Sequence, residues 1–354
     1  MSARNAERRL VLGIETSCDD TCAAVVQSGG VVRSNVVSSQ LVHERFGGVV
    51  PEVASRHHLE LINLVLARAL EEGATDLGEV DLVAVTRGPG LIGALLVGLS
   101  TAKALAASRM LPLVPVDHLH GHVAANFLAL AELEPFDPPF LCLIASGGHT
   151  LLADVRERDR FGVLGTTLDD AAGEAFDKGA RMLGLGFPGG PALERLAQEG
   201  DEHAFELPVP GRRKRPGAGV AREAFARTLD FSFAGIKTAL WQRVNALSDD
   251  ELQARRADLA ASYQAAIVEA LVLRVRQALE ASGIDRLAIG GGVAANGLLR
   301  ERVSELGATL HVPPRALCTD NAAMIAAAAL ELPALAYPDY LSIDAFAGAE
   351  LRAA

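Results

Sequence analysis

Three histidines lie in one short segment, VDHLHGHVAAN, at His118, His120 and His122. If a helix begins here, His118 and His122 are four residues apart and share one face, while His120 points elsewhere. Two imidazoles on one helical face are a common pair of metal ligands. Zinc proteases with this spacing carry a glutamate directly after the first histidine, where it acts as the base. Leu119 occupies that position, so the segment predicts a metal site that lacks the base of a zinc protease.

Asp320, in CTDNAAMIA, directly precedes an apolar segment that we expect to be helical. Thr319, Asp320 and Asn321 all belong to residue types that cap helix N-termini. A carboxylate here would alternatively complete a site of two histidines and one carboxylate, which leaves open positions on the metal. The residues alone leave both interpretations of Asp320 open.

Glycine-rich turns follow two expected strands, at Ser146-Gly147-Gly148 and at residues 290–292. Glycine lets backbone N–H groups approach a phosphate closely, although ordinary tight turns use glycine as well. Neither turn matches the Walker pattern or the dinucleotide-binding pattern. Because the two turns occupy matching places in two similar halves, they predict a site for an anion or a nucleoside.

Residues 168–178 read LDDAAGEAFDK and are strongly acidic. On a helix, Asp170, Glu174 and Asp177 would share one face. The usual explanation of such a face is exposure to solvent. The alternative is an acidic stripe that binds the hydroxyl groups of a ribose.

The expected elements alternate between strands and helices and begin again halfway along the chain. A strand, a polar turn and a second strand start at residue 10 and again at residue 140, which indicates an internal duplication. This pattern predicts an α/β protein of two similar lobes with a cleft between them. The expected strands are 10–14, 21–27, 31–38, 81–85, 113–116, 140–145, 149–155 and 286–289, and the expected helices are 58–70, one from about 91, 263–279, 296–306 and 321–330.

Composition limits the class of protein. The 354 residues are 50% hydrophobic and carry a net charge of −11. They can bury a sizeable core, so a disordered chain is excluded, and the acidic charge argues against a protein that coats nucleic acid. Four cysteines are too few for a disulfide framework. We expect a cytoplasmic protein, because neither a signal peptide nor a membrane helix is recognisable.

Ten motifs occur in order between about residues 10 and 335. They are GIETSCDDT, GGVVPEVASRHH, GPGLIGALLVG, DHLHGHVAA, ASGGHT, LDDAAGEAFDK, FPGGP, FSFAGIKTA, GGGVAANGLLR and CTDNAAMIA. Together they make the chain similar to the bacterial TsaD family, the tRNA N6-adenosine threonylcarbamoyltransferases. The resemblance implies a two-lobed actin-like (ASKHA) fold with duplicated mixed β-sheet subdomains and a central cleft. It places one subdomain at residues 8–117 plus about 322–348, and the other at 118–321 with a basic loop insertion near 208–227.

The resemblance also implies an activity and its participants. A threonylcarbamoyl group would pass from threonylcarbamoyl-AMP to N6 of the adenosine 3′ of the anticodon in ANN-decoding tRNAs, and AMP would leave. One divalent metal would be held by His118, His122 and Asp320, with iron implied by the resemblance and zinc or magnesium compatible with the ligands. The partners would be a TsaB-like paralogue and a TsaE-like P-loop ATPase. The implied substrate-binding residues are Ile144, Ala145, Ser146, Gly147, Gly148, Asp177, Gly190 and Asn296.

Some residues near these motifs have no assigned role, and no general base is assigned. They are candidates for the cleft: Glu15, Asp19, Glu174, Lys237, Gly291 and Gly292. The segment 212–227 departs from the family pattern as an insertion, and its RRKR run is the candidate surface for tRNA. Because the chain is acidic overall, we expect it to bind tRNA weakly by itself and in a salt-sensitive manner.

Three other hypotheses compete with the transferase. The fold also hosts ATP-dependent kinases and ATPases, for which Glu15 or Asp19 would have to act on a phosphoryl acceptor. A non-enzymatic scaffold is a further hypothesis, and the complete set of three metal-ligand side chains argues against it. The last of the three, a protease, is the weakest, because Leu119 replaces the required glutamate.

Overall fold

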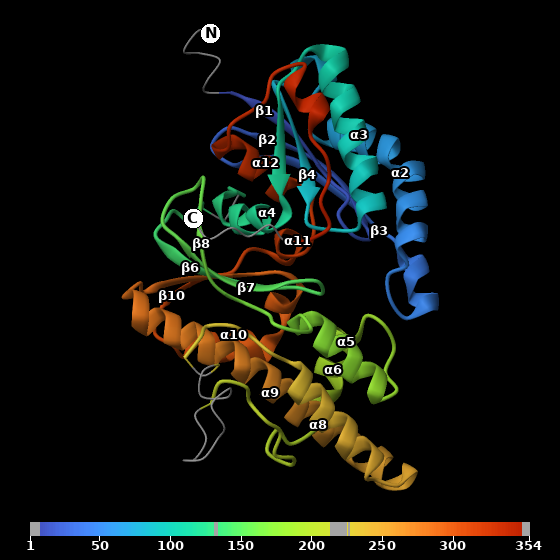
Figure 1. The fold of residues 1–354 in the computed structure, drawn as a ribbon, viewed down its shortest axis with the longest axis vertical. Coiled ribbons are helices and arrows are strands. Elements are labelled where there is room, and N and C mark those ends of the chain that lie inside the picture. Colours follow the sequence, from blue (N-terminus) through green and yellow to red (C-terminus); the bar gives the residue numbers. More distant parts are fainter. Residues whose placement is uncertain (1–7, 131–133, 213–224, 226, 349–354) are drawn as a thin grey trace. The chain divides into compact units, whose positions relative to one another are not determined.

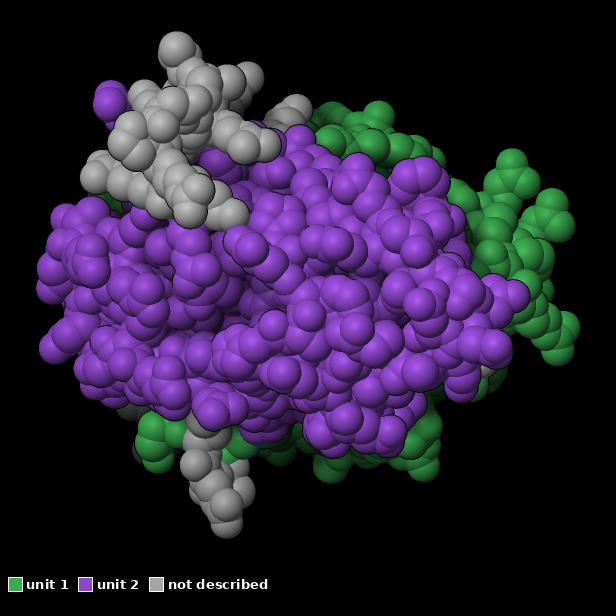
Figure 2. All heavy atoms as spheres, turned by 90° about the horizontal axis from the view of Figure 1, so that it is seen from below, with its two compact units in different colours: residues 1–138, 156–161, 316–354 green, residues 139–155, 162–315 purple. Residues whose placement is uncertain are grey.

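The computed structural model describes residues 8–130, 134–212, 225 and 227–348. The chain forms two compact units, and each is described here by itself (Figures 1 and 2). Unit 1 comprises residues 1–138, 156–161 and 316–354, and unit 2 comprises 139–155 and 162–315. The expected division gave three segments to the second subdomain that belong to unit 1, namely residues 118–138, 156–161 and 316–321.

The sheet of unit 1 has five strands in the order β3-β2-β1-β4-β5. Strands β1 and β2 pair antiparallel, as do β2 and β3, whereas β4 and β5 run parallel to β1. The turn at Gly29 and Gly30, both with positive φ, connects β2 to β3 as the sequence predicts. The bounds are β1 (Leu10–Glu15), β2 (Asp20–Gln27), β3 (Val31–Ser39), β4 (Leu82–Gly88) and β5 (Leu113–Asp117).

Successive side chains of a strand point to opposite faces of the sheet. Because the strands carry apolar side chains on both faces, helices cover both. Leu12 and Ile14 of β1 pack in one core with α2 (Pro51–Glu72) and α3 (Ile92–Arg109). Helix α12 (Ala322–Glu331) packs against β1 and β2 (Figure 1). A Cβ on Gly13 would lie 2.3 Å from the carbonyl oxygen of Ala322, so only glycine lets α12 approach β1 this closely.

The sheet of unit 2 also has five strands, in the order β10-β9-β6-β7-β8. Its first three strands in the chain pair antiparallel in succession, and β9 and β10 run parallel to β6. Numbered within each half, both sheets have the order 3-2-1-4-5 with the same strand directions. The predicted internal duplication and the α/β class are therefore confirmed. The bounds are β6 (Phe140–Ala145), β7 (Thr150–Val155), β8 (Gly162–Thr166), β9 (Arg286–Gly290) and β10 (Thr309–His311).

Helix α9 (Asp249–Ser282) is the longest helix of unit 2 and has a clear signal at each end. Ser248 and Glu251 form a capping box at its start, and Gly283 ends it in the left-handed conformation. Tyr263, Ile267 and others of the predicted ladder are buried along it. This unit also contains α5 (Ala172–Met182), α6 (Gly189–Ala197), α8 (Ala234–Asn245) and α10 (Gly297–Ser304).

The remaining helices are short. Helix α4 (His118–Ala124) follows β5 directly, and α11 (Arg315–Cys318) follows β10 in the chain. Single 3-10 turns occur at η1 (Leu41–Phe46), η2 (Leu77–Glu79), η3 (Ala125–Phe127), η4 (Gly292–Ala295) and η5 (Asp339–Ser342). No helix among the described residues is long and apolar enough to span a membrane.

Candidate metal centre and nucleotide-site residues

Helix α4 presents its histidines as the sequence predicts. Asp117 caps its start, because Oδ1 accepts the backbone N–H groups of Leu119 at 2.8 Å and His120 at 3.3 Å. His118 and His122 then lie on one face, with their ring centroids 4.7 Å apart. His120 points elsewhere: its Nε2 lies 3.3 Å from the carbonyl oxygen of Arg158.

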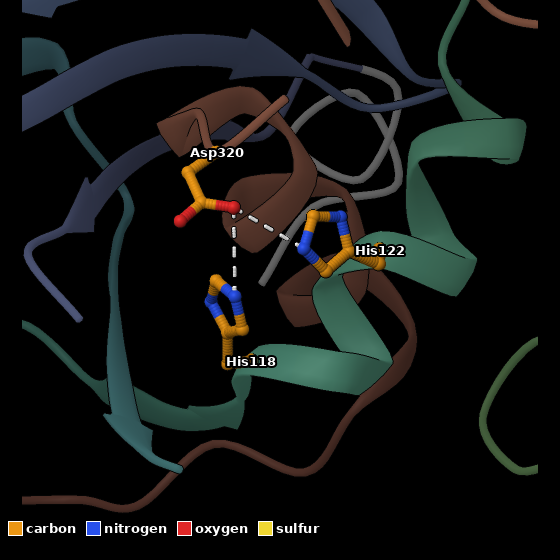
Figure 3. Close-up of side chains that lie close together, drawn as sticks. All are labelled: His118, His122 and Asp320. Carbon is orange, nitrogen blue, oxygen red and sulfur yellow. Dashed lines mark ion pairs between the residues drawn. The ribbon is translucent and has the colours of Figure 1, made fainter. Parts of the chain in front are cut away.

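Asp320 lies opposite these two rings (Figure 3). Its Oδ1 is 3.2 Å from Nε2 of His122 and 3.6 Å from Nε2 of His118. The cap of α12 is Asn321, whose side chain accepts the N–H of Met324 at 3.0 Å. The capping role that the sequence left open for Asp320 therefore belongs to its neighbour, and the Asp320 carboxylate faces the histidines.

The three side chains fit a metal ion. One ligand atom from each lies within 4.8 Å of the others. Two atoms each about 2.1 Å from one metal are separated by roughly 3.0–3.4 Å, close to the two distances measured here. The buried Nε2 of His122 makes no hydrogen bond with the described residues, since its approach to Asp320 lacks hydrogen-bond geometry. An orphaned ring nitrogen that faces a carboxylate is well suited to coordinate a cation.

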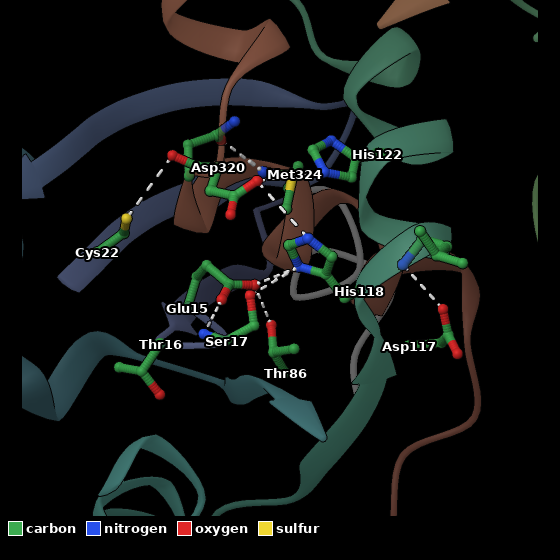
Figure 4. Close-up of polar contacts among 12 residues, drawn as sticks. Glu15, Thr16, Ser17, Cys22, Thr86, Asp117, His118, His122, Asp320 and Met324 are labelled. Atoms are coloured by element: carbon green, nitrogen blue, oxygen red, sulfur yellow. Dashed lines mark hydrogen bonds and ion pairs between the residues drawn. The ribbon is translucent and has the colours of Figure 1, made fainter. Parts of the chain in front are cut away.

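Glu15 supports His118 from the opposite side of the ring (Figure 4). Its Oε2 lies 2.9 Å from Nδ1 of His118 and accepts the hydroxyl of Thr86 at 2.5 Å. Burial lowers the pKa of His118, but the Glu15 and Asp320 carboxylates outweigh it and raise the pKa to about 9. Burial alone would raise the pKa of Glu15, but the charge of His118 and its hydrogen bond outweigh burial, so the pKa of Glu15 is lowered. The sequence motifs gave no signal for Thr86.

The first glycine turn of unit 2 follows β6, whose last residues Ile144 and Ala145 are buried. Ser146 Oγ accepts the N–H of His149 at 3.1 Å and so closes the turn. A Cβ on Gly147 or Gly148 would meet nothing within 4 Å. Packing within the protein therefore does not require these glycines, and the open backbone suits close approach by a ligand.

The second glycine turn follows β9 of the same sheet, so the expectation that the two turns occupy matching places in the two halves is wrong. This turn is used in two ways. Gly291 has φ +83°, and a Cβ there would lie 2.3 Å from the carbonyl oxygen of Ala145, so its role is structural. A Cβ on Gly292 or Gly190 would meet nothing within 4 Å, as at the first turn. Asn296 caps α10 by accepting the N–H of Leu299 at 3.0 Å, and its amide donates to Gln264 at 2.9 Å.

Asp177 joins α5 to the start of α6. Its Oδ1 accepts the N–H of Gly189 at 2.8 Å, and the N–H of Gly190 is also bonded to its carboxylate. Burial raises the pKa of Asp177, and these two backbone donors oppose the shift. The carboxylate thus belongs to unit 2, as do all eight expected substrate-binding residues.

The prediction of an acidic stripe along one helix is wrong. Helix α5 begins at Ala172, so Asp170 lies before it. Asp170 bonds Lys178 at 2.6 Å and also Lys237, and Lys178 pairs with Glu174 at 2.8 Å. These acidic groups are neutralised by lysines of the same unit, so Asp170, Glu174 and Lys237 form a structural ion-pair cluster.

Two expected features have little or no structural test. Of the basic run, only Arg212 is described, with Nη2 3.4 Å from Glu269, and residues 213–224 and 226 lie outside the described residues. Asp19 has a side-chain hydrogen bond with Cys18, and its carbonyl oxygen accepts the N–H of Gln40 at 3.1 Å.

Solved structures resemble the chain in fold. Full-length HypF in the phosphate- and nucleotide-bound form has a TM-score of 0.57 at 14% identity and matches 91% of this chain and 55% of its own. Component A of (R)-2-hydroxyglutaryl-CoA dehydratase from Acidaminococcus fermentans has a TM-score of 0.52 at 15% identity, over 94% of this chain and 100% of its own. These identities support a shared actin-like fold and nothing more specific.

Sequence comparisons identify the family. The family model described as TsaD, tRNA N6-adenosine threonylcarbamoyltransferase, matches residues 31–327. A protein of that name from Clostridium botulinum (strain 657 / Type Ba4) is 47% identical over 325 residues, which are 90% of this chain and 91% of the relative. Another, from Clostridium perfringens (strain 13 / Type A), is 46% identical over 328 residues, 91% and 92% of the two chains. The chain therefore belongs to the TsaD family of tRNA N6-adenosine threonylcarbamoyltransferases.

Proposed function

We propose that the chain transfers a threonylcarbamoyl group from threonylcarbamoyl-AMP to N6 of the adenosine 3′ of the anticodon in ANN-decoding tRNAs. The N6 amine forms the new bond to the carbamoyl carbon, the bond from that carbon to the phosphate oxygen breaks, and AMP leaves. N6 loses one proton, which passes to the departing AMP or to solvent, since no general base is assigned. The observation that carries the proposal is the group of His118, His122 and Asp320 in a member of this family.

In this proposal His118, His122 and Asp320 hold one divalent metal ion. Such an ion would act as a Lewis acid toward the oxygen atoms of the threonylcarbamoyl group. Asp117 orients the histidines, since it caps the start of α4. Iron is the metal implied by the family, and nitrogen and oxygen ligands also suit zinc or magnesium.

The residues of unit 2 bind the adenylate. The open backbone at Gly147 and Gly148 supplies N–H groups to the phosphate, the open space at Gly190 lets the ligand approach the start of α6, and Asp177 accepts from ribose hydroxyls. Ile144 and Ala145 form the buried strand end that carries the first turn, and Asn296 fixes the start of α10 beside the second. The carbamoyl carbon is already activated as a mixed anhydride, so orientation and charge stabilisation contribute most of the catalysis.

The kinase alternative lacks support from Glu15, one of its two candidate carboxylates. Glu15 is fully buried, and Ser17, Thr86 and His118 already surround its two oxygens. It is therefore not placed to accept a proton from a phosphoryl acceptor.

Partners and location complete the proposal. We infer that a TsaB-like paralogue and a TsaE-like P-loop ATPase work with the chain in the cytoplasm. The net charge of −11 supports a complex, since a protein this acidic must overcome phosphate repulsion to hold tRNA.

Reconstitution tests the proposal. The chain is mixed with the paralogue, the ATPase, an adenylate synthase, threonine, bicarbonate, ATP and an ANN-decoding tRNA, and the nucleosides are analysed by mass spectrometry. We expect threonylcarbamoyladenosine with the native chain and with the exposed-histidine control His203→Ala. The double variant His118→Ala/His122→Ala is expected to lose both the product and the metal found by elemental analysis. Full modification by the double variant would overturn the metal assignment.

A further inference from the structure

Glu15 is a buried carboxylate whose two oxygens both face hydrogen-bond donors (Figure 4). Oε1 accepts the backbone N–H of Ser17, and Oε2 accepts the hydroxyl of Thr86. Oε2 also lies 2.9 Å from Nδ1 of His118, and Ser17 Oγ is 3.2 Å from the same ring nitrogen. The group therefore contacts His118 at the nitrogen that does not face Asp320.

We propose that Glu15 is a positioning residue that makes Nε2 of His118 the metal-ligating nitrogen, an inference that rests on the proposed metal site. A neutral imidazole has one N–H and one lone pair, on different nitrogens. An ionised carboxylate can only accept, so it selects the form with the proton on Nδ1. The lone pair then lies on Nε2, 3.6 Å from Oδ1 of Asp320. Carboxylates in this outer position orient metal-bound histidines in proteins generally.

The segment that carries Glu15 cannot easily shift. Thr16 Oγ1 donates to the carbonyl oxygen of Ala94 in α3 at 2.9 Å. A Cβ on Gly98 would lie 2.4 Å from Thr16 Oγ1, and a Cβ on Gly90 would lie 2.5 Å from the carbonyl oxygen of Ser17. Close packing on two sides thus determines the direction of the Glu15 carboxylate.

The pattern of donors makes Glu15→Gln a sharp test. The backbone N–H of Ser17 can only donate, so the glutamine oxygen must take the place of Oε1. The amide NH2 then faces Thr86 and His118. The Thr86 hydroxyl can rotate to accept, whereas Nδ1 of His118 can accept only if the ring proton moves to Nε2. That proton would occupy the ligand position.

The test measures Zn²⁺ binding to the isolated chain by equilibrium dialysis against a competing chelator, without tRNA or partners. We expect about one Zn²⁺ per native chain and about 10–100-fold weaker binding in Glu15→Gln. Glu15→Asp keeps the charge but shortens the side chain, so it is expected to lose affinity to a similar degree. Glu72→Gln, an exposed glutamate of α2, is the matched control and is expected to bind like the native chain.

A second measurement reads the ring itself, which a merely structural role would not change. In long-range ¹H–¹⁵N spectra at pH 10, above the pKa of about 9 of His118, we expect the remaining ring proton on Nδ1 in the zinc-free native chain. In zinc-free Glu15→Gln we expect it on Nε2. If Glu15→Gln does not fold, Thr86→Val replaces it: one donor to Glu15 is lost, and Zn²⁺ binding is expected to weaken by less than about tenfold with the proton still on Nδ1.

The outcomes separate this inference from the proposed function. The role of Glu15 alone would be overturned if Glu15→Gln and Glu15→Asp bound Zn²⁺ with native affinity, or if Thr86→Val did so. It would also be overturned if the His118 proton lay on Nδ1 in zinc-free Glu15→Gln. A native chain that binds no Zn²⁺, Fe²⁺ or Mg²⁺ would overturn the metal site, and this inference with it.

Discussion

Oδ1 of Asp177 accepts the backbone N–H of Gly189 at 2.8 Å, so one carboxylate of α5 caps the start of α6. The same carboxylate belongs to the proposed site for the adenylate. Asp177 therefore has two roles, the cap of α6 and the proposed binding of the adenylate, and two substitutions can distinguish them.

Asp177→Asn keeps an oxygen for the cap and removes the charge. We expect the free energy of unfolding to change by less than about 0.5 kcal/mol. Binding of a non-hydrolysable adenylate analogue is expected to weaken about tenfold, since a charge-assisted hydrogen bond to the ribose is lost. Asp177→Ala should weaken binding as well and also destabilise the protein by about 1 kcal/mol. Urea unfolding and calorimetric titration measure the two quantities, and native binding by Asp177→Asn would contradict the assignment.

Gly148 and Gly173 form a second matched pair. A Cβ on Gly148 meets nothing, whereas a Cβ on Gly173 would lie 2.6 Å from the carbonyl oxygen of Ser146. We expect Gly148→Ala to leave stability unchanged and to weaken binding of the adenylate analogue at least about tenfold, because the methyl group blocks close approach to the backbone. Gly173→Ala is expected to lose roughly 1–3 kcal/mol of stability. Native binding of the analogue by Gly148→Ala would show that the open backbone at Gly148 has no special role.

Asp20 predicts a pH dependence of stability. Burial raises its pKa to about 7, the charges of Asp320, Asp19 and Glu15 add to the shift, and a hydrogen bond with Ser39 opposes it. The unfolded pKa is near 4, so the folded state holds an extra proton between about pH 4 and pH 7. Ionisation of the Asp20 side chain therefore lowers the free energy of unfolding progressively as the pH rises through this window. The total loss across the window is roughly 2–4 kcal/mol.

Asp20→Asn removes this penalty. We expect the variant to be more stable than the native chain at pH 8 and about equal at pH 4, as measured by urea unfolding at both values. The exposed control Asp159→Asn is expected to behave like the native chain at each pH. A stability gain of the same size at both pH values would rule out the titration of Asp20 as its cause.

Binding of tRNA provides the fourth prediction. The isolated chain is expected to bind tRNA weakly, with an affinity that falls steeply as salt rises. Replacing residues 212–215 by alanine should lower the affinity and reduce the slope of its logarithm against the logarithm of salt concentration. Filter binding at several salt concentrations measures both. The control replaces four exposed arginines of unit 1, namely Arg33, Arg56, Arg68 and Arg109. Tight binding by the native chain at physiological salt would contradict the prediction.

The sequence predicts best what depends on local spacing. The pair His118 and His122 follows from helix geometry, and the repeated strand pattern at residues 10 and 140 predicts the two matching sheets. The buried ladder from Tyr263 onward follows from the same helical period. In these cases neighbouring residues along one element contain the whole signal.

Contacts between distant segments explain what the sequence could not predict. Asp169 accepts the N–H of Phe233 at 2.7 Å, so it caps α8 and does not extend α5. Positions 319–321 hold three successive residues that could each cap a helix. Only the three-dimensional position of the histidines shows that Asp320 faces them, while Asn321 caps α12. Ser17 Oγ contacts Nδ1 of His118, and Thr86 reaches the same group through its hydroxyl bond to Glu15. Ser17 lies in a recognised motif, whereas no motif marks Thr86.

The route of the chain has a consequence for assembly. His118 and His122 come from α4 early in the chain, whereas Asp320 appears only after the chain has left unit 2 for the last time at residue 316. During synthesis, which proceeds from the N-terminus, nearly the whole polypeptide must leave the ribosome before the carboxylate can meet the two imidazoles. A nascent or C-terminally truncated chain would thus expose two histidines without their acidic partner, so the group of three side chains is completed late in the maturation of this protein.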